Sequence, residues 1–184
     1  MNEQIQKPYL KWVGGKTQII NEILSKVPNE MENYHEIFLG GGSVLFAILS
    51  LQKLGKINIK NKVYAYDINH GLINSYRQIQ TNPNQLLKQI NDYINVYKSI
   101  KTNNINRNPL NDEQAQTSQE SYFYWLRKCY NSNSKDTIDS AALFIIINKL
   151  CFRGMYREGP NGYNVPFGHY KKIPTIITED EILK

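Results

Sequence analysis

The sequence predicts an α/β fold, and three observations predict it. Between residues 35 and 67, a hydrophobic strand, a glycine turn, a helix and a second strand ending in an acid follow one another. Apolar residues then recur at helical spacing along much of residues 72–150. Finally, two strand-like segments flank a cluster of turn residues at 159–162. The first pattern is the order of a nucleoside-binding half-fold.

The first helix is expected directly after Lys16. Apolar residues recur there at helical spacing and stop at Pro28, which a helix does not easily continue through. These residues are Ile19, Ile20, Ile23, Leu24 and Val27. Residues 35–39 are then expected to form a buried strand, because they are mostly apolar and lead into three consecutive glycines.

A helix over residues 44–54, closed by Gly55, and a second strand over residues 63–66 complete the half-fold. A short helix over residues 72–79 marks its end. From Pro83 to Ile100 the apolar residues lie on one helical face, which predicts an amphipathic helix against a core.

The segment 101–116 is rich in Asn and Gln and has no periodicity, so an exposed loop is expected. Thr117 and Glu120 have the spacing of a capping box at the start of a helix through Cys129. Either Asp136 or Thr137 could cap the next helix, whose apolar run over residues 141–147 predicts burial on all sides.

A projecting β-hairpin is expected over residues 155–165. Met155 to Glu158 and Tyr163 to Val165 are its strands, and a four-residue turn cluster beginning at Gly159 joins them. This hairpin carries Arg157.

The glycine turn and the following acid fit a nucleoside site. Gly42 and Asp67 are 25 positions apart, and an acid at about 20 residues or more is placed to accept hydrogen bonds from ribose hydroxyls. A tight turn without a ligand is the open alternative. A triphosphate-binding loop is disfavoured because position 10 is Leu10, and a dinucleotide fingerprint because Leu45 stands where its third glycine belongs.

Composition limits the type of partner and the cellular location that are expected. The 184 residues are 41% hydrophobic, enough for a core, and the net charge of +6 favours a polyanionic partner, although such an excess also occurs in proteins without one. Cys129 and Cys151 lack paired spacing for zinc or a disulfide framework, so no metal is expected. Without an apolar targeting segment or a run of membrane length, a cytoplasmic, membrane-free location is expected.

Five blocks between residues 7 and 172 resemble the Dam-type adenine-specific DNA methyltransferases, in the same order. Lys7 to Lys16 is similar to the family's opening Pro-Phe-Leu-Lys-Trp-Ala-Gly-Gly-Lys, and Glu36 to Phe46 to its Glu-Pro-Phe-Val-Gly-Gly-Gly block. Asp67 to Asn69, followed by Tyr76, is similar to its Asp-Ile-Asn block. The last two blocks, at 151–157 and 162–170, resemble Phe-Asn-Gly-Leu-Tyr-Arg and Phe-Asn-Val-Pro-Phe-Gly-Arg-Tyr.

The resemblance implies S-adenosylmethionine as cofactor, which has no pyrophosphate and therefore needs no dinucleotide fingerprint. The cofactor-binding residues that it implies are Trp12, Lys16, Phe38, Gly40, Gly42 and Asp67. Each of three has a plainer alternative: Trp12 as a core anchor, Lys16 as a solvated lysine and Asp67 as a helix cap.

The resemblance also implies double-stranded DNA as partner. The DNA-binding residues expected are Arg153, Arg157, Asn164, His169, Lys171 and Lys172. Arg157 suits a bidentate contact with guanine, the alternative being a surface pair with Glu158 or a phosphate contact. Tyr156 and Tyr163 could stack on bases or pack within the hairpin. Arg153 and His169 differ from the family's usual asparagine and arginine, which leaves the recognised DNA sequence open.

One departure from the family concerns catalysis. The family's catalytic strand ends in Asp-Pro-Pro-Tyr, and no Asp, Asn or Ser followed by Pro-Pro and an aromatic residue occurs here, so no catalytic residue is assigned. The expected organisation is a cofactor-binding half over 1–71, a mostly helical target-recognition insert over 72–172, and the start of the return to an absent catalytic half over 173–184.

The expectation is therefore an incomplete Rossmann-like methyltransferase sheet, in a truncated or split adenine methyltransferase. An incomplete sheet exposes an edge and apolar surface, so a second polypeptide supplying the catalytic half is expected as a partner. The alternative is a non-catalytic DNA-binding remnant of such an enzyme.

Overall fold

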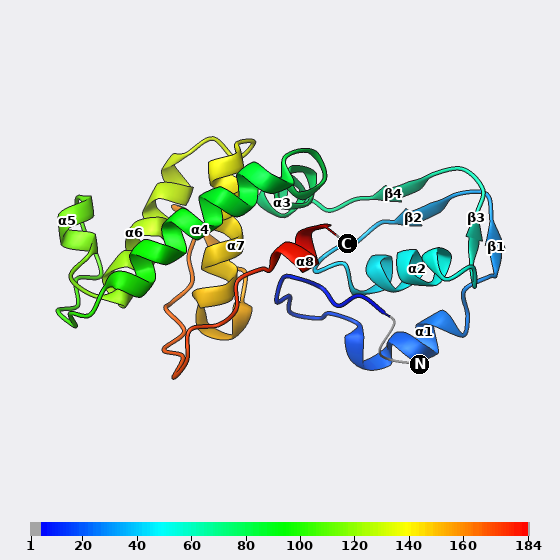
Figure 1. Cartoon of the computed structure of the whole chain (residues 1–184), viewed down its shortest axis with the longest axis horizontal. Coiled ribbons are helices and arrows are strands. Elements are labelled where there is room, and N and C mark those ends of the chain that lie inside the picture. Colours follow the sequence, from blue (N-terminus) through cyan, green and yellow to red (C-terminus); the bar gives the residue numbers. More distant parts are fainter. Residues whose placement is uncertain (1–4, 184) are drawn as a thin grey trace. The chain divides into compact units, whose positions relative to one another are not determined.

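Two units make up the computed structural model, which describes residues 5–183 (Figure 1). The first extends to Asn69 and contains short parallel strands and helices. The second begins at His70 and is mostly helical, with one antiparallel strand pair. The fold is thus mixed α/β, as predicted. Within the described part of the chain, no helix is both long and apolar enough to cross a bilayer.

Parallel strand pairs form the centre of the first unit. β1 (Glu30–Met31) pairs with β3 (Asn58–Ile59), and β2 (Tyr34–Glu36) pairs with β4 (Val63–Ala65). Met31 pairs with Ile59, and Tyr34 pairs with Val63. The segment that joins β3 to β4 is therefore one residue longer than the segment that joins β1 to β2. The two pairs are therefore separate two-stranded sheets and not one continuous ladder. The pairing of β1 with β3 was not predicted.

Helices cover one face of these strands. α2 (Ser43–Lys53) follows the glycine turn, as predicted, and its Ile48 packs with Ile57 and Ile59 in a buried cluster. The helix expected after Lys16 is shorter than its apolar pattern. It consists of the 3-10 turn η1 (Thr17–Ile19) and α1 (Ile20–Leu24), and it ends four residues before Pro28.

The prediction of a buried strand at 35–39 is wrong. Ile37 and Phe38 are 63% and 85% exposed, and regular pairing stops at Glu36. Among the residues that the structure describes, β2 pairs only with β4. Its outer face carries a stack of exposed rings in which His35 lies 4.6 Å from Tyr64.

The second unit is built around α7 (Ile138–Leu150), whose residues are nearly all buried, as the apolar run predicted. Three helices pack on it in Figure 1: α3 (His70–Thr81), α4 (Pro83–Ser99) and α6 (Gln119–Ser132). A short α8 (Glu179–Leu183) contacts α4, and Ile176, Ile177 and Ile182 of this C-terminal segment are buried.

The structure corrects one prediction about a helix start and decides between the alternatives of another. Ser118, not Thr117, caps α6, because its hydroxyl accepts a hydrogen bond from the N–H of Ser121 at 2.9 Å. Of the two candidates for α7, Thr137 is the cap and accepts from Ser140 N at 3.0 Å. The segment expected to be a plain loop contains α5 (Asp112–Ala115).

An antiparallel pair lies inside the segment predicted as a hairpin. β5 (Glu158–Gly159) faces β6 (Gly162–Tyr163), so the strands are shorter than predicted and only Pro160 and Asn161 form the turn. The pairing continues by one hydrogen bond, from Asn164 N to Arg157 O at 2.8 Å.

Candidate functional site

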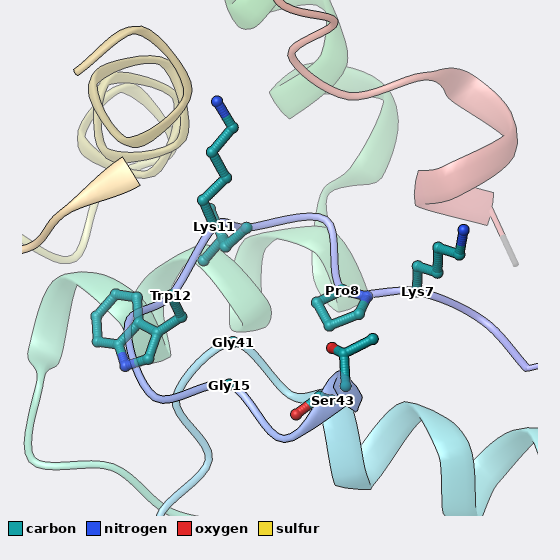
Figure 2. A pocket seen from close by; sticks show the side chains of 9 residues that line it. Lys7, Pro8, Lys11, Trp12, Gly15, Gly41 and Ser43 are labelled. Carbon is teal, nitrogen blue, oxygen red and sulfur yellow. The ribbon is translucent and has the colours of Figure 1, made fainter. Parts of the chain in front are cut away.

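A pocket of about 300 Å³ lies in the first unit, between the N-terminal segment and the start of α2. Figure 2 shows Trp12 on one side of it and Pro8 and Ser43 on the other. The volume is at the lower end of the range of small-molecule sites, about 300–1,000 Å³. The lining residues are Lys7, Pro8, Leu10, Lys11, Trp12, Gly15, Thr17, Gly41 and Ser43.

The glycine turn requires glycine for two reasons. Gly40 and Gly42 have φ of +49° and +76°, in the left-handed region that other residues rarely adopt. In addition, a Cβ atom on Gly40 would lie 2.9 Å from Cδ1 of Trp12. A Cβ on Gly41 would lie equally close, 2.9 Å, to Cβ of Trp12. The absence of side chains therefore lets Trp12 pack directly on the turn.

Asp67 fastens the same turn to the end of the second strand. Its Oδ2 accepts a hydrogen bond from Gly40 N at 2.9 Å, and its Oδ1 accepts one from Asn69 N at 2.9 Å. A carboxylate has about four acceptor sites, so two remain for a ligand. Trp12, Gly40 and Asp67 thus form one continuous set of contacts.

The other predicted cofactor residues lie elsewhere in the unit. The ammonium group of Lys16 donates to Gly14 O at 2.6 Å, and its main-chain N–H donates to Ser43 Oγ at 2.9 Å. Phe38 is exposed, and of the six predicted residues only Trp12 lines the pocket.

Sequence reasoning missed Lys7, Lys11, Thr17 and Ser43 as lining residues. Lys7 and Lys11 lie within the block at residues 7–16, and Thr17 follows it directly. Their position in or beside this block could have identified them as lining residues.

A half-buried carboxyl group lies at the end of β2. Tyr34 donates a hydrogen bond from its hydroxyl to Glu36. Burial raises the pKa of Glu36, and the hydrogen bond from Tyr34 opposes this effect. Burial also raises the pKa of Tyr34. Within residues 5–183, no cluster of three His, Cys, Asp or Glu side chains is placed to hold a metal ion.

In the second unit, α6 holds the segment that follows the hairpin turn. The Asn131 side chain brackets Tyr163, accepting from its N–H at 2.8 Å and donating to its carbonyl at 3.1 Å. One helical turn earlier, Arg127 donates to Val165 O at 2.5 Å. The hairpin stem and the chain after it therefore have a defined position on the helix.

The aromatic residues within the hairpin and just before it differ in exposure. Tyr163 is 1% exposed, and its ring packs against Tyr130, Phe144 and Tyr156. It is a core residue, which was one of the two alternatives. Phe152, which sequence reasoning did not select, is 43% exposed and lies under the guanidinium of Arg153, 5.1 Å from Cζ to ring centroid.

All six predicted DNA-binding residues are exposed. Arg157 donates through Nε to Asn164 O at 2.9 Å, and no ion pair joins it to Glu158 among the described residues. His169 lies with its Nε2 3.7 Å from Oε2 of Glu120. Arg153 and His169 both have positive φ, of 56° and 47°.

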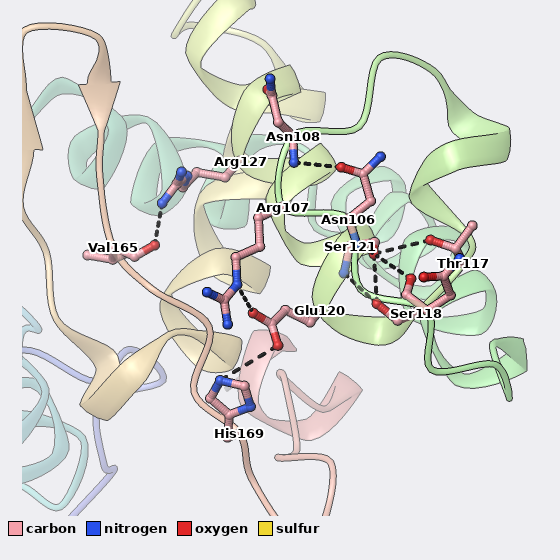
Figure 3. A network of polar contacts seen from close by, with 11 residues as sticks. Asn106, Arg107, Asn108, Thr117, Ser118, Glu120, Ser121, Arg127, Val165 and His169 are labelled. Carbon is pink, nitrogen blue, oxygen red and sulfur yellow. Dashed lines mark hydrogen bonds and ion pairs between the residues drawn. The ribbon is translucent and has the colours of Figure 1, made fainter.

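Two further arginines lie on or beside α6. Arg127 lies over the ring of Tyr124, 4.8 Å from the centroid, and burial lowers its pKa, with Arg157 acting in the same direction. Arg107 forms an ion pair with Glu120 (Figure 3). Glu120, Tyr124 and Arg127 follow one another at helical spacing, which was a signal in the sequence.

A family model and the similar proteins of known function all describe methyltransferases. A family model described as D12 class N6 adenine-specific DNA methyltransferase matches residues 12–184. The type II methyltransferase M.MjaIII of Methanocaldococcus jannaschii is 32% identical over 184 residues, which cover 96% of this chain and 56% of that protein. The type II methyltransferase M1.LlaDCHI of Lactococcus lactis subsp. cremoris is 28% identical, with 96% and 52% covered.

A DNA adenine methylase of Haemophilus influenzae is 29% identical over 177 residues, with 96% of this chain and 51% of that protein covered. The chain spans about half the length of the curated relatives it matches.

Proposed function

The chain belongs to the family of D12 class N6 adenine-specific DNA methyltransferases, and from this premise we propose that it binds S-adenosylmethionine through its first unit and duplex DNA through its second. The reaction that these two activities serve is methylation of the exocyclic amine of adenine. The family match over residues 12–184 carries this proposal.

The first unit fits the cofactor. The pocket beside Trp12 has a suitable volume of about 300 Å³, and the glycine turn, on which Trp12 packs, holds this side chain at the pocket wall. Asp67 keeps acceptor capacity for ribose hydroxyls after its two main-chain hydrogen bonds. We assign the ribose to Asp67 and a packing contact to Trp12. When bound, S-adenosylmethionine supplies the methyl group.

The second unit supports DNA binding. Its predicted contact residues are all exposed, and the stem of its hairpin is fixed to α6. Arg157 has no carboxylate partner among the described residues, so its terminal N–H groups can contact a base or a phosphate. Phe152 and Arg153 form an exposed aromatic and cationic pair, suited to a base that leaves the stack.

Methyl transfer also needs a group that accepts hydrogen bonds from the target amine. The printed sequence contains no Asp-Pro-Pro-Tyr motif, so we propose that these 184 residues position both ligands and that further polypeptide supplies this group. An incomplete Rossmann-like sheet around β2 and β4 is part of this proposal. The packing of Trp12 and Asp67 on the glycine turn favours donor binding over a remnant that binds only DNA.

Calorimetry with S-adenosylmethionine, and DNA binding measured at several salt concentrations, test the proposal together. We expect binding of the cofactor and an affinity for DNA that falls as salt rises. Salt-dependent DNA binding without cofactor binding would favour the remnant instead. Absence of both would overturn the proposal. Robust methyl transfer by the 184 residues alone would show that a catalytic group lies within them.

A further inference from the structure

The segment 101–111 is fixed in place, although its composition predicted an exposed loop. Asn104 N donates to Thr117 O at 3.0 Å, and Asn106 N donates to Ser121 Oγ at 2.7 Å. Further along, Leu110 N donates to Gln114 Oε1 at 3.0 Å. Figure 3 shows the contacts near the start of α6. The main chain on both sides of Arg107 therefore has a defined position.

The side chain of Arg107 is also fixed, but only at its inner edge. Its Nε donates to Oε1 of Glu120 at 2.7 Å, and the side chain of Arg107 is 67% exposed whereas that of Glu120 is 4% exposed. This hydrogen bond and the carboxylate charge raise the pKa of Arg107. Among the described residues, no other group takes a hydrogen bond from its guanidinium, so the four terminal N–H donors face solvent.

Other positive charges lie on the same side of the unit. Arg127 comes two turns after Glu120 on α6 and interacts electrostatically with Arg157. Each of these two arginines donates only to a main-chain carbonyl, Val165 O and Asn164 O, so neither charge is neutralised by a carboxylate among the described residues. Glu120 is thus the carboxylate that pairs with Arg107, and His169 is its second neighbour.

We propose that Arg107 contacts a phosphate of duplex DNA and that Glu120 is the positioning residue that orients it. The inference rests on the proposed DNA-binding function and adds a contact outside the hairpin. A guanidinium presents paired N–H donors that match two phosphate oxygens, and holding it at Nε reduces the conformational entropy lost on binding. A phosphate is favoured over a base because the open edge lies on a fixed surface segment, and backbone contacts need no entry into a groove.

A purely structural role makes a different prediction. A buried carboxylate needs a partner charge, and Arg107 supplies one whether or not DNA binds. In that case, removing Arg107 would lower the stability of the fold and leave the affinity for DNA unchanged. Stability and affinity therefore have to be measured on the same variants.

The experiment compares Arg107→Ala, Arg107→Lys and Lys88→Ala with the unsubstituted 184-residue protein. Lys88 is the matched control because it is an exposed basic residue of α4 that pairs with Asp92. Fluorescence anisotropy with a labelled duplex at several salt concentrations gives the dissociation constant and its salt dependence. Thermal unfolding followed by circular dichroism verifies that each variant is folded.

For Arg107→Ala we expect roughly tenfold weaker binding and a slope of log affinity against log salt that is smaller by about 0.9, the value for one lost phosphate contact. Arg107→Lys should retain most of the salt dependence but bind DNA more weakly, because lysine keeps the positive charge and lacks the paired N–H donors of the guanidinium. Lys88→Ala should behave like the unsubstituted protein. Normal affinity and slope in folded Arg107→Ala overturn the inference.

Glu120→Gln tests the positioning role. We expect lower affinity with an unchanged salt slope, since the charge of Arg107 remains, and no further loss when the substitution is added to Arg107→Ala. An equal loss in both backgrounds overturns the positioning role. If Glu120→Gln does not fold, the affinity and salt dependence of Arg107→Ala and Arg107→Lys test the inference. Failure of the unsubstituted protein to bind DNA at all rejects the proposed function, whereas normal binding by Arg107→Ala rejects only this inference.

Discussion

Trp12 and Gly40 are in such close contact that a single methyl group on the glycine would lie 2.9 Å from the indole ring. The same glycine donates its N–H to Asp67 at 2.9 Å. The position of the tryptophan, the shape of the turn and the position of the acid are therefore coupled. A change at any of the three should be measurable as altered cofactor binding.

Gly40→Ala should abolish binding of S-adenosylmethionine, measured by calorimetry. The substitution combines a left-handed backbone, which costs on the order of 1–3 kcal/mol, with the collision against Trp12. Gly55→Ala is the matched control because Gly55 also has positive φ, +69°, but nothing lies within 4 Å of its missing Cβ. It should lose only the stability that the left-handed backbone costs, on the order of 1–3 kcal/mol, and keep cofactor binding. Equal binding by the two variants would contradict the role assigned to the turn.

Asp67→Ala should weaken cofactor binding by roughly tenfold or more, because a charged acceptor of the ribose hydroxyls and the anchor of Gly40 are both lost. The exposed Asp92, which pairs only with Lys88 among the described residues, provides the control substitution Asp92→Ala. Calorimetry on both variants measures their affinity for S-adenosylmethionine. Unchanged affinity in Asp67→Ala would leave Asp67 with a structural role alone.

Asn131→Ala should loosen the hairpin stem. The substitution leaves the N–H and carbonyl of Tyr163 without their side-chain partner, and we expect a loss of about 1–3 kcal/mol in the free energy of unfolding. Affinity for DNA should fall as well. Asn95→Ala, on an exposed position of α4, should change neither quantity. Denaturant unfolding and anisotropy measure the two effects, and full stability in Asn131→Ala would disprove the anchoring role.

Phe152→Ala should affect DNA far more than the fold. Because the ring is 43% exposed, its removal should change the free energy of unfolding by about 0.5 kcal/mol or less. If Phe152 fills the space left by an extruded base, a 2-aminopurine probe at the target adenine should show less fluorescence increase with the variant. The fully buried Phe144 is the contrast, since Phe144→Ala should cost about 3–5 kcal/mol. An identical probe response with and without Phe152 would remove it from the interface.

Glu36 should make the first unit more stable in acid. Burial raises the pKa of Glu36, so the folded protein holds this proton more tightly than the unfolded chain. The charged carboxylate therefore destabilises the fold above the raised pKa, and this destabilisation disappears as the pH falls through it. Glu36→Gln should stabilise the protein at pH 7 by less than about 1 kcal/mol, since solvent screens a half-exposed group. Denaturant unfolding at neutral and acidic pH should show the difference shrinking in acid.

Local patterns predicted the helices well and the strands less well. The all-round apolar run that became α7 predicted burial because a helix without a polar face has to be enclosed. Residues 35–39 include the apolar run Ile37 to Leu39, but burial of a strand depends on neighbours on both edges and both faces. Within the described residues β2 has one neighbour and ends at Glu36, and Ile37 and Phe38 are exposed.

In the candidate site, too, short motifs predicted some contacts, whereas contacts between distant segments were missed. The glycine turn, Trp12 and Asp67 were predicted from short motifs, and the structure brings them together. Glu120 was interpreted as part of a capping box, whereas it pairs with Arg107, 13 residues earlier, and with His169. Local spacing could not reveal these partners, because the contacts depend on how the Asn-rich segment and the chain after the hairpin fold back on α6.

The attachment of residues 163–169 along α6 has a consequence for chimaeras built between this chain and its relatives. Tyr163, Val165 and His169 each meet a side chain of that helix, at Asn131, Arg127 and Glu120 in reverse order. These contacts fix the register of residues 163–169 along α6, so the segment and the helix have to be exchanged together. Only the tip at Pro160 and Asn161, which has no such register, can be lengthened or shortened on its own.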